Sequence, residues 1–232
     1  MATAVLPDID TERRAVAPWW HTAVLIGFFV VMAVAGARVQ SDGVGRRPNV
    51  RLLYVSLIAG EWGLVYYVWK AGLRRTGTKI VDLIGGKWVS PRPILLDGLL
   101  ALTTWVVWRG VAWCWFVWFG MGTAASISRL LPNSVGESML WVLLSISAGF
   151  SEELVFRGYL QRQLTALTGS VTVALLLQSA LFGIAHGYQG WRSCMAIAVY
   201  GALFTMLALW RRSLRPGMTA HAWTDIVGGL LR

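Results

Sequence analysis

Long uncharged stretches alternate with short polar links along most of this chain. A helix needs about 20 apolar residues to cross the roughly 30 Å hydrocarbon core of a bilayer. The pattern predicts about seven such helices, and no strand-like alternation or internal repeat competes with it. Their expected ranges are 19–37, 52–69, 94–128, 138–164, 164–191, 193–210 and 216–231.

In lipid every backbone polar group must find its partner within a helix. The sequence therefore predicts an all-α, polytopic integral membrane bundle. Residues 1–18 form an N-terminal cytoplasmic tail in this prediction. Residues 19–128 supply three transmembrane helices joined by basic loops, and residues 138–232 supply the remaining four.

Composition supports lipid as the solvent. Of 232 residues, 56% are hydrophobic and 14% are charged, against about 45–50% and about 25% in soluble domains. The fourteen tryptophans favour membrane–water interfaces. The net charge of +10 comes from bases scattered between apolar segments, so we expect anionic lipid, and no nucleic acid, as a partner.

Basic residues also predict the orientation. With the N-terminus inside, thirteen Lys and Arg residues fall on the cytoplasmic side and seven on the other side. This bias predicts a multi-pass protein of the cell (plasma or inner) membrane with a cytoplasmic N-terminus. The first 17 residues carry five charges and no apolar stretch, so no cleavable signal peptide is expected.

Ionisable side chains at membrane depth cost several kcal/mol unless they are paired, which makes them functional candidates. The first group lies in EELVFRG. Adjacent helical residues point about 100° apart, so Glu152 and Glu153 cannot have the same role. Glu153 and Arg157 are four residues apart and can pair, which would leave Glu152 facing a cavity as a general base. The alternative is an interfacial charge cluster where the helix leaves the membrane.

Two histidine groups follow. Phe182 and His186 share a helix face in FGIAH, although a single intramembrane histidine is more often a packing residue. In HAWTD, His221 and Asp225 share a face, so the carboxylate could fix the imidazole tautomer or bind beside it. The alternative for this second group is a helix-stabilising pair.

The three groups can reach one site. At 1.5 Å per residue, Glu152 and His186 lie at similar depth if their helices are antiparallel neighbours. His221 can join them if the fifth helix continues past His186 towards Trp191. The sequence therefore permits a shared site.

In this order on successive helices, EELVFRG, FGIAH and HAWTD resemble the EExxxR, FxxxH and HxxxN or HxxxD motifs of the CAAX-protease and bacteriocin-processing (CPBP) family. The resemblance covers about residues 138–231, and the first three helices match only in character. The third motif ends in Asp225, where many members have Asn, and this changes the local proton balance.

The resemblance implies an intramembrane endopeptidase that hydrolyses a membrane-associated, CAAX-like protein or peptide, with or without a lipid. In the family's mechanism, Glu152 would activate a water molecule that attacks the peptide carbonyl. His186, His221 and Asp225 would orient that water or stabilise the oxyanion.

The resemblance gives supporting roles to three further residues. Glu153 and Arg157 would hold the motif helix in place, and Phe182 would shape the substrate pocket. If the enzyme used a metal such as zinc, His186 and His221 would be ligands. Because no HExxH lies on one helix, we favour water activation without an obligatory metal.

Two other function classes stay open. A non-proteolytic member of the same fold, acting as an immunity or scaffold protein, should tolerate Glu152→Gln. A small ion-coupled transporter should contain inverted repeats, and none is evident. Outside the motifs, Glu61 and Arg109 could pair across the bundle, and His21 is expected at the membrane interface.

Overall fold

The computed structural model describes residues 14–42, 47–120 and 128–231, and these residues are almost entirely helical. The described part of the chain contains no strand, only one isolated bridge between Gly85 and Ser213. The predicted all-α bundle is therefore confirmed.

Five helical stretches are long and apolar enough to cross a membrane. They are formed by α2 (Trp19–Asp42), α3 (Val50–Tyr67) with η1 (Val68–Leu73) and α4 (Arg74–Thr76), α6 (Pro91–Phe119), α8 (Val135–Glu152) with η2 (Glu153–Leu160) and α9 (Gln161–Thr168), and α11 (Trp191–Arg211). Two shorter helices, α10 (Val171–Ala185) and α12 (Arg215–Leu230), complete the seven helical stretches predicted from the sequence. The chain also forms the small helices α5 (Ile80–Ile84) and η3 (Gly187–Gln189).

The ends of the third and fourth helices and the start of the fifth differ from the prediction. The third helix ends at Phe119, and most of the remainder expected up to residue 128 lies outside the described residues. The fourth extends to Thr168, because Gly169 adopts a left-handed conformation (φ 70°) that ends it. Ser170 then caps the next helix by accepting a hydrogen bond from the Val173 N–H.

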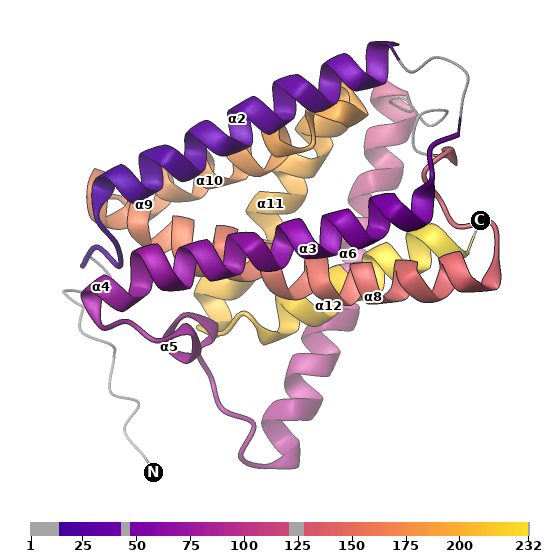
Figure 1. Cartoon of the computed structure of the whole chain (residues 1–232). Coiled ribbons are helices and arrows are strands. Elements are labelled where there is room, and N and C mark those ends of the chain that lie inside the picture. The colour runs from indigo at the N-terminus through magenta and orange to yellow at the C-terminus, as the bar shows by residue number, and fades with distance from the viewer. Residues whose placement is uncertain (1–13, 43–46, 121–127, 232) are drawn as a thin grey trace.

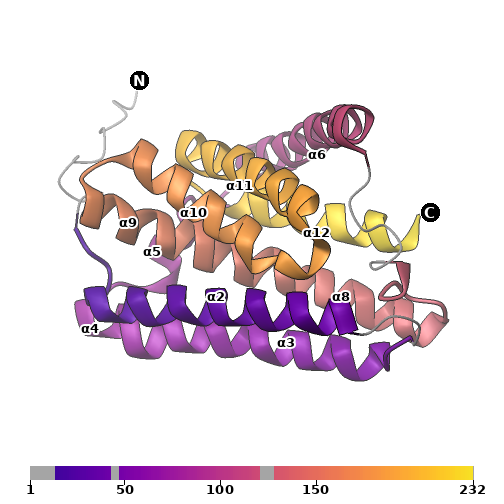
Figure 2. The same cartoon turned by 90° about the horizontal axis from the view of Figure 1, so that it is seen from above.

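The stretch α8–η2–α9 is the centre of the bundle. Within its membrane window 56% of the residues are buried, against 17–28% in the other four spans. It packs against α3 and α12, while α10 packs against α11 and α2. Figures 1 and 2 show these elements around the central stretch, with α6 set apart at the side of α11 and α12.

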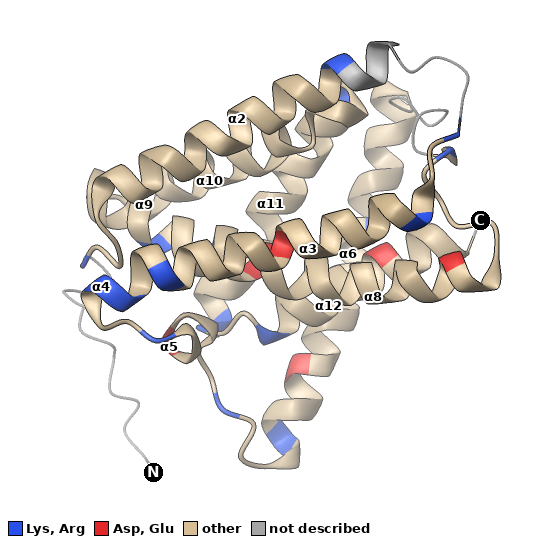
Figure 3. Ribbon diagram, viewed as in Figure 1, with Lys and Arg blue, Asp and Glu red and all other residues tan. Residues whose placement is uncertain are grey.

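The outer faces of the helices are apolar, as expected for side chains that meet lipid. Trp118 on α6 is 81% exposed, and large hydrophobic residues are exposed on every long helix. Basic residues gather near α4, α5 and the start of α6 (Figure 3).

His21, which was expected at the membrane interface, is a buried residue of the bundle core. Its side chain is fully buried, its Nδ1 lies 2.7 Å from the Tyr159 hydroxyl, and its ring stacks on Tyr67 at 4.2 Å. Gly72 in the π-helix η1 leaves room for it, because a Cβ there would lie 3.0 Å from the imidazole. The amphipathic ring therefore serves helix packing.

The segment before α2 is tied to α9 by one buried glutamine. Gln163 Oε1 accepts hydrogen bonds from the N–H groups of Val16 (2.9 Å) and Ala17 (3.1 Å), and its Nε2 donates to the Ala17 carbonyl (2.7 Å). The amide thereby satisfies backbone groups ahead of a helix, where no intrahelical partner exists.

The predicted ion pair between Glu61 and Arg109 does not form. Arg109 is exposed on α6, and none of the ion pairs among the described residues includes either side chain. Glu61 instead lies on the face of α3 that packs against α8.

Candidate active site

The first motif lies where the central helix changes its hydrogen-bonding pattern. Glu152 is the last residue of α8, and Glu153 begins the π-helix η2, all eight residues of which are buried. π-helical turns inside α-helices are rare and occur often at functional sites. The sequence alone predicted a continuous helix here and gave no signal for this change.

A fully buried ion pair stands behind the site. Arg157 Nη1 lies 3.3 Å from Glu153 Oε1, and neither side chain is exposed. The guanidinium lies over the Phe182 ring at 4.1 Å, so the pair is enclosed by aromatic carbon. The structure thus joins Glu153 and Arg157 as their spacing predicted.

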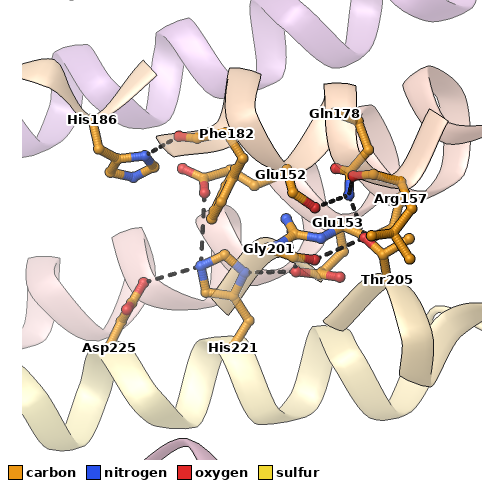
Figure 4. A network of polar contacts seen from close by, with 12 residues as sticks. Glu152, Glu153, Arg157, Gln178, Phe182, His186, Gly201, Thr205, His221 and Asp225 are labelled. Carbon is orange, nitrogen blue, oxygen red and sulfur yellow. Dashed lines mark hydrogen bonds and ion pairs between the residues drawn. The ribbon is translucent and has the colours of Figure 1, made fainter. Parts of the chain in front are cut away.

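Glu153 also orients the histidine of the third motif. His221 Nδ1 lies 2.9 Å from Glu153 Oε1, while its Nε2 lies 3.7 Å from both Glu152 Oε2 and Asp225 Oδ2 (Figure 4). The two longer distances exceed a hydrogen bond. The partner that fixes the imidazole is therefore Glu153, from another helix, and not Asp225 one turn away.

Aromatic rings hold His221 on its remaining sides. Tyr200, Phe204 and Phe182 present their rings edge-to-face to it, with centroids at 5.3, 6.0 and 6.2 Å. Such packing limits the imidazole to one orientation in an apolar surrounding. Tyr200 and Phe204 belong to no motif, and nothing in the sequence separated them from other aromatic residues of the bundle.

Close helix packing brings α12 to the central helix. A Cβ at Gly149 would lie 2.8 Å from the Met218 carbonyl oxygen and from the Ala222 N–H nitrogen. A Cβ at Gly217 would lie 3.0 Å from Glu153 Oε2. Only glycine permits these approaches, which set His221 beside both glutamates.

His186 lies at the edge of the same site. Its Nδ1 donates to the Phe182 carbonyl at 2.8 Å, which leaves Nε2 to face other groups. In the view of Figure 4, the Glu152 carboxylate lies between the imidazoles of His186 and His221. The expectation that the helix continues past His186 is wrong, because α10 ends at Ala185 and the turn η3 leads to Gly190 (φ 83°).

A polar network lies behind Arg157. Gln178 Nε2 donates to the Thr205 hydroxyl, which donates in turn to the Gly201 carbonyl at 2.8 Å (Figure 4). All three residues are buried and link α10 to α11. These hydrogen bonds satisfy the Gln178 Nε2 and the Thr205 hydroxyl without a carboxylate of the site.

The side chains of this site that could bind a metal ion are the imidazoles of His186 and His221 and the neighbouring carboxylates. Catalytic zinc takes three protein ligands that converge on one point. Among the residues that the structure describes, no group of three His, Cys, Asp or Glu side chains is arranged to hold a metal.

The fold and the site together define a polytopic helical membrane protein with a buried acid–histidine centre. Residues 134–227 match the family described as type II CAAX prenyl endopeptidase Rce1-like. The matched segment is less than half of the chain, runs from α8 to α12, and contains all three motifs, so the resemblance to the CPBP proteases is confirmed. No curated protein and no solved structure matches the chain.

Proposed function

We propose that the protein is an intramembrane endopeptidase in which Glu152 activates the attacking water. The observation that carries this proposal is the placement of the Glu152 and Asp225 carboxylates 3.7 Å from one side of His221, while Glu153 holds its other side. The Rce1-like match supports a protease of the CAAX-processing type.

In the proposed reaction, Glu152 takes a proton from water as the water oxygen bonds to the peptide carbonyl carbon. The oxyanion is stabilised by donors from His186 or His221. Glu152 then returns the proton to the amide nitrogen, the C–N bond breaks, and an acid and an amine leave. Asp225 balances the charge of His221 during these steps.

Glu153 and Arg157 have supporting roles in this scheme. Because Glu153 accepts from His221 Nδ1, the other ring nitrogen is directed to Glu152 and Asp225. Arg157 compensates the Glu153 charge, which would otherwise be buried alone. Phe182 covers that pair and packs edge-to-face against the His186 ring at 4.9 Å.

The substrate that we propose is a membrane-associated, CAAX-like protein or peptide, with or without a lipid. We further propose a plasma or inner membrane location with a cytoplasmic N-terminus, and contact between the basic loops and anionic lipid. A polar site inside an apolar bundle suits a peptide bond that approaches from the membrane.

The test is cleavage of a farnesylated CAAX peptide by the purified full chain in vesicles. Glu152→Gln should lower the rate at least about 100-fold, the range for loss of a general base, while Glu137→Gln on the same helix should retain activity. Equal cleavage by wild type and Glu152→Gln would refute Glu152 as the base.

A chelator added to the same assay separates the two mechanisms. Unchanged cleavage supports water activation by Glu152 alone. Loss of cleavage that zinc restores would instead make His186 and His221 ligands of a bound metal. If the wild type cleaves no membrane-bound peptide, a non-proteolytic immunity or scaffold role is favoured.

A further inference from the structure

A cavity of about 230 Å³ lies at one end of the bundle, apart from the carboxylates of the candidate active site. Arg157, Gln161 and Thr165 of the central stretch line one of its walls, and all three are buried. These residues are four positions apart, so they share one face of the helix. At 1.5 Å per residue they form a polar stripe about 12 Å long. The cavity therefore carries polar groups from near the end of α9 into the bundle.

The facing wall comes from the last turns of α11 and the link that follows it. Thr205, Arg212 and Ser213 line this wall. Two membrane-spanning stretches end beside the cavity, at Thr168 and Arg211. Basic residues gather near α5, which also borders the cavity (Figure 3). Because the spans end here, we expect the mouth of the cavity at the depth of lipid headgroups.

The lining has an excess of positive charge. Three of its twelve residues are arginines, namely Arg157, Arg162 and Arg212, and no acidic residue of the described chain is among the twelve. Glu153 pairs with Arg157 and so offsets one of the three charges. Arg162 also donates to the Asp82 carbonyl at 2.7 Å, which holds it beside the cavity. A concave site lined by charges of one sign attracts the opposite sign, so the expected ligand is an anion.

The guanidinium of Arg157 has donors that no described residue satisfies. Arg157 is 3% exposed, and its Nε and Nη2 are buried without a hydrogen-bond partner. Its Nη1 lies 3.3 Å from Glu153 Oε1, and the group lies over the rings of Phe182 (4.1 Å) and Phe204 (5.9 Å). Unsatisfied buried donors in a native protein indicate a bound water, ion or ligand. Two N–H groups in the plane of one guanidinium fit two oxygens of a phosphate.

The anion is not part of the peptide that is cleaved. Glu152, His186 and His221 do not line the cavity, which is joined to them only through the contacts of Arg157 and Glu153. Basic pockets between transmembrane helices bind the phosphates of lipid headgroups. The volume of the cavity is several times the roughly 30 Å³ of one water molecule, which leaves room for a phosphate group.

We propose that this cavity binds a phosphate group, carried by an anionic phospholipid or free in solution. Arg157 binds the phosphate at the inner end of the cavity, and Arg162 and Arg212 bind it from the outer part. The hydroxyl of Ser213 accepts from the Arg215 N–H, so its own hydrogen can be donated to the phosphate. This site is separate from the peptide site and does not depend on the proposed protease function.

The experiment measures the binding of dioctanoyl phosphatidic acid to the purified full chain in a maltoside detergent, by titration in native mass spectrometry. Dioctanoylglycerol, the same lipid without its phosphate, is the ligand control. We expect the wild type to bind phosphatidic acid and not dioctanoylglycerol. Arg212→Gln should raise the Kd about five-fold, the effect of one basic residue near a lipid headgroup, and adding Arg162→Gln should raise it about 25-fold.

Arg92→Gln is the matched control variant. Arg92 is exposed at the start of α6, where basic residues also gather, and it does not line the cavity. The Kd of this variant should be unchanged. Equal weakening by Arg92→Gln and Arg212→Gln would indicate diffuse attraction to a basic surface and would overturn the proposal, as would equal binding of the two lipids.

Inorganic phosphate, added as a competitor, separates the two sources of the phosphate group. Displacement of the lipid shows that phosphate alone is a sufficient ligand. Binding of the lipid without displacement shows that the site takes a phospholipid headgroup. Either result supports the proposal, whereas a wild type that binds neither phosphatidic acid nor phosphate refutes it.

A second readout places the ligand at Arg157. In protein labelled with ¹⁵N-arginine, the Nε–H signal of Arg157 is assigned by its loss in Arg157→Lys. This signal should shift when phosphatidic acid is added and stay in place with dioctanoylglycerol. An unshifted signal at saturating phosphatidic acid would overturn the proposal. Both readouts measure binding, so their outcome is independent of whether the chain cleaves a peptide.

Discussion

Removing the guanidinium of Arg157 tests whether the buried ion pair is needed for stability or only for function. Arg157→Met keeps a long apolar side chain under Phe182 but leaves the Glu153 carboxylate, fully buried, without its cation. Breaking a buried pair from one side costs about 3–5 kcal/mol. Because the His221 Nδ1 contact at 2.9 Å remains, we expect a loss near the lower limit, about 3 kcal/mol.

The matched variant is Glu153→Gln combined with Arg157→Met. Replacing both charges avoids a lone buried ion, so the free energy of unfolding should return to within about 1–2 kcal/mol of wild type. The glutamine oxygen can still accept from His221, but it carries no charge to orient the imidazole, so cleavage should stay well below wild type. The measurement is equilibrium unfolding in mixed micelles with increasing dodecyl sulfate, together with the peptide assay. If the double variant is as unstable as Arg157→Met, the cost does not come from an uncompensated carboxylate and the reasoning fails.

Three further predictions follow from packing and burial. Gly149→Ala should push α12 away from the central helix, lower stability by about 1–3 kcal/mol and reduce cleavage about 100-fold through misplacement of the site. Gly228→Ala, at a position with no atom within 4 Å of an added Cβ, is its control and should change neither melting nor cleavage. Gln163→Ala should lower the free energy of unfolding by about 2–3 kcal/mol, because three buried hydrogen bonds are lost; an unchanged melting temperature would contradict this. Burial raises the pKa of Tyr188 to about 12, so its phenol stays neutral between pH 6 and 10. Tyr188→Phe should therefore leave the shape of the pH–activity profile unchanged in this range. A missing alkaline limb in the variant would show that Tyr188 titrates there.

The helices could be predicted because lipid imposes a strict rule on the sequence. Uncharged runs of sufficient length had to be helical, and the spacing of four residues between Glu153 and Arg157 was enough to predict their contact. Both inferences rest on local geometry along one helix. They required no knowledge of how the helices pack.

What the sequence could not predict depends on packing between helices. The side of α3 that faces the bundle is fixed only by its contact with α8, and this contact sets Glu61 against α8 and not in an ion pair with Arg109, which is exposed on α6. The bond from His221 to Glu153 joins residues 68 positions apart and depends on the close approach at Gly149. The π-helical hydrogen bonding of η2 requires no particular residue type, so a sequence pattern could not predict it.

The lengths of α10 and α12 have a consequence for the surrounding lipid. With 15 and 16 residues these helices rise only about 22 and 24 Å, less than the roughly 30 Å of an average hydrocarbon core. Such a mismatch is relieved by local thinning of the bilayer. The turn after His186 would then meet headgroups and water at a depth where lipid is usually dry. We expect cleavage in vesicles to become faster as the acyl chains are shortened, since a thinner leaflet carries water and a membrane-bound peptide closer to Glu152.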